Sequence, residues 1–464
     1  EAKQKSNSFV DFNGDGFTDI ALPVPFEDFQ GNVDAGGINI QYGTAAGFRG
    51  SGNQFITLKS MKLVPAAGDL LGWDGVATDI NGDGFTDLIV SAPGRNNRNG
   101  SVFIIKGSSS GLLPKQATEL AKPALSTADQ NQLGSCVTVG DFNGDGNIDI
   151  AAGAAGFSSS SKKELGAVAF FMQIPQALRA SSKKQVGPDM IIDPDSPGIK
   201  GTGQAEERFG YKCAAGFLND DTISDIAIST ERPSGRGSVH ILFGGVATSS
   251  FVTNKMFQGK KDDRAFGSAL TVDRSVTPNR LFIGAPNSLD SKGRVYSLIN
   301  TNDLKTIFTG SNNGDLSGWA LASYFNAAAG TFLAIGSPGF DVQTPTPSAG
   351  TKVIEDGGRV TVISINPNTE VPAFFDDFSD PNARLLGHSL STTIGTNGTG
   401  FIAGAPGTSV AGAPDIGECD QLVFDTAAGG LSLIRIFTQN SRGVKDASET
   451  GDMMGRTAIT FIPQ

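Results

Sequence analysis

Histidine and cysteine are nearly absent from this sequence of 464 residues, which contains two histidines and three cysteines. Three cysteines cannot form a disulfide framework, and two histidines leave little material for a zinc site or for catalysis by imidazole. The scarcity of these residues therefore argues against the common metal-dependent and histidine-dependent enzymes.

Long apolar stretches and an excess of positive charge are missing too. No run of about 18 apolar residues occurs, so we expect no membrane span. Lysine and arginine number 36 against 47 aspartates and glutamates, a formal net charge of −11. A surface that follows nucleic-acid phosphates needs clustered positive charge, so we expect no nucleic-acid partner. The sequence starts at Glu1 without an apolar leader, which indicates either a mature product or a trimmed chain.

What the sequence has is glycine, 61 residues of it, and an internal repeat. One nonapeptide occurs as DFNGDGFTD at 11–19, DINGDGFTD at 79–87 and DFNGDGNID at 141–149. Each copy leads into an apolar run that reads as a β-strand. A degenerate fourth copy, FLNDDTISD, lies at 217–225. Repeats of this kind indicate an array of similar structural units.

A larger unit surrounds the nonapeptide. It opens with an apolar residue and glycine, continues through two apolar strands and a small-small-Pro turn such as GAP at 284–286, and reaches a third strand that often begins Gly-x-Val. The seven opening glycines are Gly72, Gly134, Gly210, Gly267, Gly318, Gly387 and Gly455. Units of roughly 65 residues with β-type alternation predict four-stranded blades. We therefore expect an all-β, seven-bladed β-propeller that forms a single domain over residues 1–464.

The two ends of the sequence complement each other. The first acidic loop lacks an opening strand before it, and the last opening strand, MMGRTAITF at 453–461, lacks a loop after it. We expect the C-terminal strand to pair with the N-terminal blade and close the ring, which would leave no open sheet edge.

The opening glycine, the DxNGDGxxD loop and the GAP turn, repeated in this order, resemble the FG-GAP repeat propeller of integrin α chains and bacterial integrin-like proteins. The resemblance covers the chain from about Phe9 to Pro463. It implies a propeller fold, whereas a fold by itself does not determine a function.

The acidic loops predict calcium sites. A hard cation takes six or more oxygen ligands, and oxygen side chains at loop positions 1, 3, 5 and 9, with a carbonyl at position 7 and glycine at position 6, supply them around a sharp bend. The resemblance implies Ca²⁺ at the same positions. The predicted ligands are Asp11, Asn13, Asp15, Phe17 and Asp19; Asp79, Asn81, Asp83, Phe85 and Asp87; and Asp141, Asn143, Asp145, Asn147 and Asp149.

The fourth loop should bind calcium weakly or not at all. Phe217 replaces its first aspartate, and only Asn219, Asp221 and Asp225 remain. An acidic turn without a metal is the alternative for all four loops, but three aspartates within nine residues repel one another without a cation.

A candidate ligand site lies at the residues that follow the opening glycines, on the face opposite the calcium loops. These residues are Trp73, Ser135, Tyr211, Ser268, Trp319, His388 and Arg456, and they include both tryptophans of the chain. In integrin α chains, aromatics at matching positions surround the mouth of the channel and hold a basic side chain. We select Trp73, Tyr211, Trp319, His388 and Arg456 as candidate ligand-binding residues, although ordinary strand packing would also explain aromatic side chains here.

Cys136 and Cys213 follow two opening glycines by two and three residues. We interpret them as buried thiols of adjacent blades in preference to a disulfide.

Two functions remain open at this point. The favoured one is a non-enzymatic, Ca²⁺-binding adhesion or ligand-binding module, secreted or at the cell surface and monomeric, that binds an extracellular protein or glycan. The alternative is a carbohydrate-active enzyme, such as a polysaccharide lyase, on a propeller scaffold, with Arg456 and His388 in its central groove.

Overall fold

The structure is a computed structural model of the chain. It describes residues 9–121, 130–172, 174, 178, 185–231, 235–245, 251, 254–301, 303–326, 330–345, 351–365, 372–393, 399–409, 416–425, 430–438, 441, 452–457 and 459–461.

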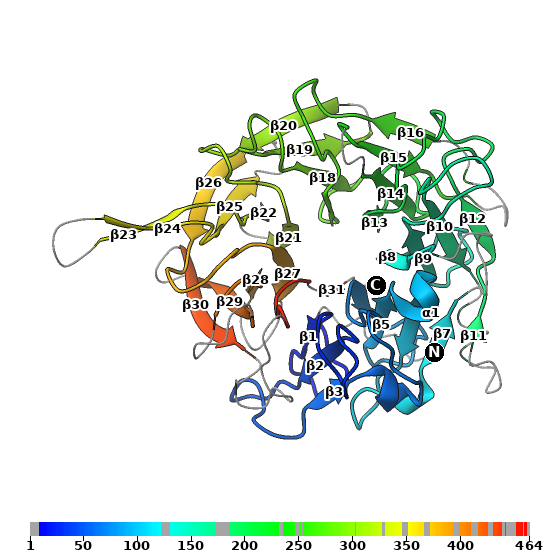
Figure 1. Ribbon diagram of the computed structural model, residues 1–464, viewed down its shortest axis with the longest axis horizontal. Coiled ribbons are helices and arrows are strands. Elements are labelled where there is room, and N and C mark those ends of the chain that lie inside the picture. Colours follow the sequence, from blue (N-terminus) through cyan, green and yellow to red (C-terminus); the bar gives the residue numbers. More distant parts are fainter. Residues whose placement is uncertain are drawn as a thin grey trace.

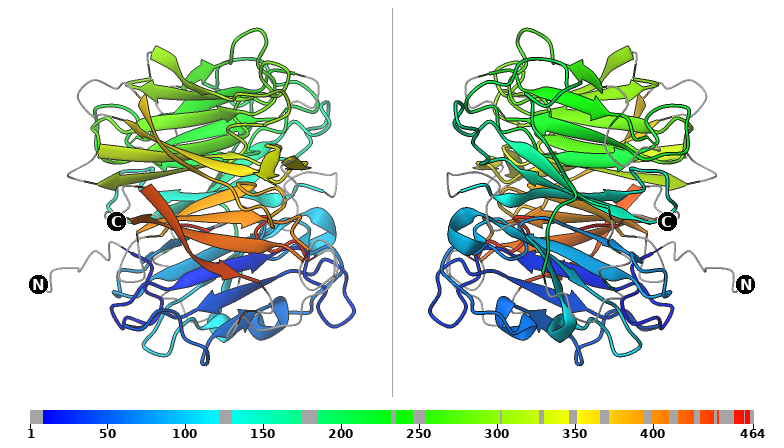
Figure 2. Two further views of the ribbon diagram at one scale, coloured as in Figure 1. Left: turned by 90° about the vertical axis from the view of Figure 1, so that its left-hand side faces the viewer. Right: turned by 90° about the vertical axis from the view of Figure 1, so that its right-hand side faces the viewer.

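Seven antiparallel sheets, called blades 1 to 7 in chain order, are arranged in a ring around a central opening (Figure 1). Seen from the side, the strands lie across the disc and connecting loops project from its two faces (Figure 2). The predicted seven-bladed propeller is therefore confirmed.

The first three blades contain the acidic loops. Blade 1 consists of β1 (Ile20–Val24), β2 (Gly37–Gln41) and β3 (Gln54–Ile56); blade 2 of β4 (Gly75–Thr78), β5 (Asp87–Ala92), β6 (Ser101–Ile105) and β7 (Thr118–Leu120); and blade 3 of β8 (Leu133–Gly140), β9 (Asp149–Ala154), β10 (Ala167–Phe171) and β12 (Met190–Ile192). The described helical segments of these blades are η1 (Leu58–Met61), α1 (Arg95–Arg98) and η2 (Pro114–Gln116). A further strand, β11 (Gln185–Val186), pairs in parallel with β7 at the outer edge of blade 2.

The other four blades each have four strands. Blade 4 consists of β13 (Cys213–Gly216), β14 (Asp225–Thr230), β15 (Ser238–Leu242) and β16 (Asn254–Phe257); blade 5 of β17 (Ala269–Asp273), β18 (Arg280–Ala285), β19 (Arg294–Ile299) and β20 (Asp303–Thr309); blade 6 of β21 (Leu321–Asn326), β22 (Gly330–Ser337), β25 (Arg359–Ile365) and β26 (Pro372–Phe378); and blade 7 of β27 (Ser389–Thr393), β28 (Gly400–Ala405), β29 (Glu418–Asp425) and β30 (Gly430–Phe437). A separate hairpin of β23 (Val342–Pro345) and β24 (Thr351–Ile354) extends outward from blade 6 (Figure 1).

The hydrophobic core is divided among the contacts between neighbouring blades. One apolar cluster joins Ile89 and Val102 of blade 2 to Ala152 and Ala169 of blade 3, and other clusters join the later blades in the same way. The sheets bury both faces, which explains why the second strands read as continuous apolar runs.

Glycines let the blades approach each other closely. A Cβ atom added to Gly336 of β22 would lie 2.0 Å from the carbonyl oxygen of Gly387, which opens blade 7. A Cβ atom added to Gly284 or Gly404 would likewise lie 2.0 Å from the carbonyl oxygen of the opening glycine of the next unit, Gly318 or Gly455. The glycine of the small-small-Pro turn is thus required because backbone meets backbone at this contact.

The ring closes differently from the expected pairing. The strand β31 (Thr460–Phe461) pairs in parallel with β4 of blade 2, and among the described residues it does not pair with β1. Blade 1 accordingly has three strands there and not four. Pairing of the C-terminal strand with blade 1 is not confirmed, but β1 packs on blade 7 through an apolar cluster that includes Leu22, Ile402 and Met454.

A disulfide joins Cys136 of β8 to Cys213 of β13, so the interpretation of these residues as free thiols is wrong. Both lie on inner strands of adjacent blades, with their Cα atoms 5.8 Å apart, a spacing that a disulfide spans easily. The sequence places both cysteines near opening glycines, but it does not show that their side chains face each other. Cys419 is free and buried.

Within the described part of the chain, no helix has the length and apolar character to cross a bilayer.

Candidate functional site

The first aspartate of each complete acidic loop holds the turn together through backbone N–H groups. In the loop before β5, Asp79 Oδ1 accepts hydrogen bonds from the amides of Gly82 and Asp83, and its Oδ2 accepts from Gly84. The loop at 141–149 repeats this arrangement around Asp141. Gly84 has a φ of 90°, a conformation that favours glycine.

The ninth residue of each loop is a buried aspartate that connects the loop to the rest of its blade. Asp87 Oδ1 accepts from the amide of Gly107, just after β6, and its Oδ2 accepts from Ile80. Burial, followed by repulsion from the other loop carboxylates, raises the pKa of Asp87 to about 8. The same two causes raise the pKa of Asp19 to about 7 and that of Asp149 to about 8.

The other predicted ligands lie within the same turns. The fifth-position carboxylates, for example Asp83 Oδ1, accept from the amide of the seventh residue, which is Phe17, Phe85 or Asn147. The third-position side chains lie beside them: Asn13 donates to Asp15, Asn143 to Asp145 and Asn81 to Asp87.

The donor set of these loops fits a hard cation, because carboxylate, amide and carbonyl oxygens gather around one bend. In the first loop, however, Arg49 Nη2 lies 2.6 Å from Asp15 Oδ2 and supplies part of the positive charge. Among the described residues, the three carboxylates of an acidic loop also do not place one oxygen each within 4.8 Å of the other two.

The fourth loop keeps its turn without the first carboxylate. The amide of Asp221 donates to Asn219 Oδ1, and Asp225 accepts from Leu218 and Gly244. Phe217, in the place of the first aspartate, is 41% exposed.

The central opening contains a cavity of about 340 Å³ that the inner strands line. All five candidate ligand-binding residues line it, and so does Ser268: the set is Trp73, Tyr211, Ser268, Trp319, His388 and Arg456. Ser135 is not among its lining residues, and its hydroxyl donates to the carbonyl of Gly210 at 2.8 Å.

His388 and Arg456 form a pair on one side of this cavity. Arg456 Nη1 lies 3.1 Å from His388 Nε2, and the rings of His388 and Trp319 have centroids 5.3 Å apart. Burial, together with the charge of Arg456, lowers the pKa of His388 to about 3. The imidazole is therefore neutral near pH 7 and accepts a hydrogen bond from the guanidinium.

The two other aromatic residues of the cavity, Trp73 and Tyr211, lie near further aromatic and cationic side chains. Phe26 lies between Trp73, at a centroid distance of 6.3 Å, and the guanidinium of Arg456, at 5.9 Å. Lys212 Nζ lies 5.5 Å from the ring of Tyr211. Burial, followed by the charge of Glu231, raises the pKa of Tyr211 to about 12, so the phenol stays protonated.

Sequence reasoning missed four charged residues of the cavity, namely Asp74, Lys212, Glu231 and Arg274. Asp74 and Lys212 directly follow predicted ring residues, so the inner strand continuing along the channel could have indicated them. Arg274 follows β17, and nothing in the sequence pattern points to it. Its guanidinium donates to the carbonyl of Ala215 at 2.6 Å.

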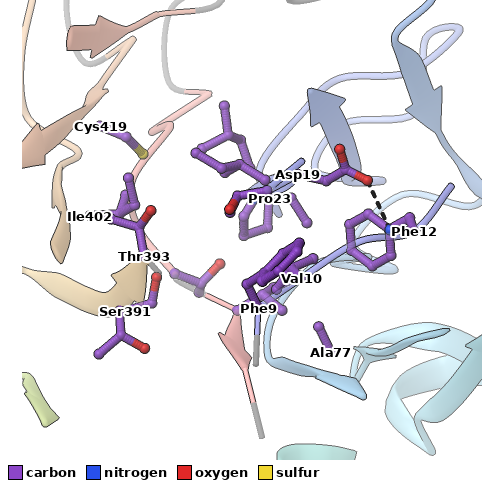
Figure 3. A pocket seen from close by; sticks show the side chains of 17 residues that line it. Phe9, Val10, Phe12, Asp19, Pro23, Ala77, Ser391, Thr393, Ile402 and Cys419 are labelled. Carbon is purple, nitrogen blue, oxygen red and sulfur yellow. Dashed lines mark hydrogen bonds between the residues drawn. The ribbon is translucent and has the colours of Figure 1, made fainter. Parts of the chain in front are cut away.

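A second, smaller cavity of about 40 Å³ lies where the two ends of the chain meet, between β1 and blade 7 (Figure 3). Phe9, Val10 and Pro23 face Thr393, Ile402 and Cys419 across it. It is too small for an organic ligand and is best described as imperfect packing at the closure of the ring.

Comparison with known proteins gives three kinds of similarity. The family model described as FG-GAP repeat matches residues 6–38, 71–105 and 134–171. Phosphatidylinositol-glycan-specific phospholipase D of Bos taurus is 27% identical over 347 residues, which cover 67% of this chain and 39% of that protein. The same enzyme of Homo sapiens is 28% identical over 256 residues, covering 51% of this chain and 28% of that protein.

Integrin alpha-PS5 of Drosophila melanogaster is 32% identical over 150 residues, which cover 32% of this chain and 14% of that protein. Among solved structures, the periplasmic gluconolactonase PpgL of Pseudomonas aeruginosa aligns with a TM-score of 0.48 and 10% identity, covering 94% of this chain and 97% of that one. The chain spans well under half the length of the phospholipase D and integrin relatives.

The phospholipase D relatives contradict the expectation that the protein is not an enzyme. That expectation rested on the scarcity of histidine and cysteine. Scarcity of histidine excludes only chemistry that depends on imidazole, so the inference was too broad.

Proposed function

Because this chain is an FG-GAP repeat propeller that resembles those of integrin α chains, we propose that its central cavity binds a phosphorylated glycan, either free or as part of a glycolipid. The propeller would do so as part of an enzyme that acts on that substrate. The observation that carries the proposal is the convergence of three aromatic side chains and several cations on one cavity.

The chemistry of the cavity matches such a ligand. The faces of Trp73, Tyr211 and Trp319 can stack on the apolar faces of sugar rings, and Arg456 and Lys212 offer charged donors for a phosphate. A volume of about 340 Å³ accommodates one or two sugar units. The similarity to phosphatidylinositol-glycan-specific phospholipases D supports the same ligand class, since glycan and phosphate occur together in the substrate of that name.

Titration calorimetry with a soluble inositol-phosphate glycan tests this proposal. We expect Trp319→Ala and Arg456→Gln to weaken binding about tenfold or more, since each removes a direct contact. Phe325→Ala is the matched control, because Phe325 is an exposed aromatic on β21 outside the cavity. Removal of the phosphate from the glycan should weaken binding to the parent chain but not to Arg456→Gln. Unchanged affinity of both cavity variants would contradict the proposal.

We also propose that the three complete acidic loops bind Ca²⁺, with the loop at 217–225 weak or without an ion. The proposal is supported by the donor set, by the raised pKa values of Asp19, Asp87 and Asp149, and by the family resemblance. The ion would supply the positive charge that three close carboxylates need, and it would hold each loop against its blade.

An adhesive role, in which the same face binds an extracellular protein, is the second candidate and is favoured by the integrin relatives. Location outside the cytosol suits both candidates, because a disulfide such as Cys136–Cys213 persists in oxidising compartments. We propose a secreted or cell-surface monomer. If the cavity variants lose binding to a protein ligand but bind no glycan, this second role is the correct one.

A further inference from the structure

A second group of carboxylates lies in blade 7, away from the acidic loops. Asp380 precedes β27, in the segment that crosses from blade 6, and Glu418 and Asp420 lie at the start of β29. All three are buried, with 6%, 5% and 0% of their surface exposed, and one oxygen of each lies within 4.8 Å of the others. It is the only such group in the described part of the chain.

Blades 5 and 6 show how a carboxylate at the position of Asp380 is balanced there. In blade 5, Asp263 lies in the crossing segment before β17, and Arg294 Nη1 at the start of β19 lies 2.7 Å from it. In blade 6, Arg359 at the start of β25 lies 3.9 Å from Asp315, which precedes β21. Each acid of the crossing segment therefore faces an arginine on the third strand.

Blade 7 has a glutamate in the place of that arginine. A glycine with positive φ marks this position of the repeat. It precedes Arg294 with a φ of 87°, Arg359 with 85° and Glu418 with 77°. In blade 7, a positive partner is thus replaced by a second negative one. Among described residues, no lysine or arginine forms an ion pair with Asp380, Glu418 or Asp420.

Asp420 adds a third negative group without a partner. Its counterpart two residues after the arginine in blade 5 is Tyr296, which donates its hydroxyl to Asp263. Both carboxylate oxygens of Asp420 are buried and accept no hydrogen bond from the residues that the structure describes. An unpaired buried carboxylate is costly, and this one faces two further carboxylates.

Among the described residues, the hydrogen-bond donors to the other two members of the group are neutral. Asp380 Oδ1 accepts from the amide of Asn382, and the Thr408 hydroxyl lies 3.4 Å from Glu418 Oε1. Burial, followed by mutual repulsion, raises the pKa of Glu418 to about 7 and that of Asp420 to about 8. Either protons or a cation must balance such a group.

We propose that Asp380, Glu418 and Asp420 bind a hard divalent cation such as Ca²⁺ or Mg²⁺, with the Thr408 hydroxyl beside it. Three carboxylates on a rigid strand and its crossing segment are the oxygen donors that such ions prefer. The ion takes the place that the Arg294 guanidinium has in blade 5. The site lies at the end of blade 7 where β28 connects to β29. The acidic loops of blades 2 and 3 connect the first strand to the second, so they lie at the opposite end of their blades.

Counting bound ions tests the proposal. The purified chain is equilibrated with Ca²⁺, and in a parallel arm with Mg²⁺, then freed of unbound ion and analysed by mass spectrometry of the metal. We expect Asp420→Asn and Glu418→Arg each to bind one ion fewer than the parent chain in at least one arm. This difference does not depend on how many ions the acidic loops bind.

Two further variants sharpen the test. Asp303→Asn removes an exposed carboxylate of β20 and should leave the ion count unchanged. Glu418→Arg restores the arginine of blades 5 and 6, so without divalent ions it should melt at a higher temperature than the parent chain without them. If Glu418→Arg does not fold, the isosteric Asp420→Asn decides alone. An equal ion count for parent and Asp420→Asn with both metals overturns the proposal, since shared protons then balance the group.

Discussion

Gly336 illustrates how single residues fix the spacing of the blades. A Cβ atom at this position would lie 2.0 Å from the carbonyl oxygen of Gly387, which cannot move without displacing the first turn of blade 7. We expect Gly336→Ala to lower the free energy of unfolding by about 3 kcal/mol or more, the size of effect seen when a close-packed core is overfilled. Denaturant unfolding measures it.

Gly187→Ala is the matched control, because nothing lies within 4 Å of a Cβ atom added there. Its effect should be within about 0.5 kcal/mol. Equal stability of both variants would show that the blades have room to separate.

His388 predicts an acid dependence of stability. Its pKa is lowered to about 3 in the folded chain and should return to about 6.5 on unfolding, so the unfolded chain binds one more proton between these pH values. Stability contributed by the neutral imidazole is present above pH 6.5 and is lost as the pH falls toward 3. Arg456 and Lys212 are the charges that face it.

Replacement of His388 by glutamine should make the free energy of unfolding less sensitive to acid. The loss of stability between pH 7 and pH 5 should be about 1–2 kcal/mol smaller than in the parent chain. The measurement is the free energy of unfolding at both pH values for the parent and His388→Gln. An identical pH dependence in the two chains would mean that the imidazole is already protonated in the folded state or solvated.

Among the structural elements, the acidic loops give the clearest prediction. If they bind Ca²⁺, then EDTA should lower the melting temperature by about 5–10 °C, because each site contributes about 2–3 kcal/mol at a hundredfold excess of ion over its dissociation constant. Asp83→Asn should remove about a third of this shift.

Asp221→Asn, at the equivalent position of the fourth loop, should leave the shift unchanged. Scanning calorimetry with and without EDTA provides both values. A loss of the shift in Asp221→Asn, with none in Asp83→Asn, would reverse the assignment of complete and degenerate loops.

The elements also show what the sequence can predict. The repeat determined the blades because glycine, the acidic nonapeptide and the GAP turn are local signals that recur with the same spacing. Six of the seven residues after the opening glycines line the central cavity, because the first strands of the blades are innermost, whereas Ser135 does not. The pairing of β31 and the Cys136–Cys213 disulfide depend on how two distant strands face each other, and no local pattern records this.

The carboxylate group in blade 7 was missed for a related reason. Glu418 and Asp420 lie close together in sequence, but Asp380 reaches them only through the crossing segment. Alignment of the third strands, with Arg294 and Arg359 at the equivalent position, would have shown the change of charge.

At the scale of the whole molecule, each blade is packed against two others. Apolar clusters join successive blades, and the cluster that includes Leu22 and Met454 joins the last to the first. We propose that residues 1–464 form one domain, and we expect a single calorimetric transition whose van't Hoff and calorimetric enthalpies agree. Two separated transitions would show that part of the ring unfolds independently.

The only two tryptophans of the sequence, Trp73 and Trp319, both line the central cavity. The tryptophan fluorescence of the protein, excited selectively, therefore originates at this one place. A quencher that enters the channel should extinguish almost all of the emission, so an unlabelled sample can report whether the channel is open to solutes of a given size.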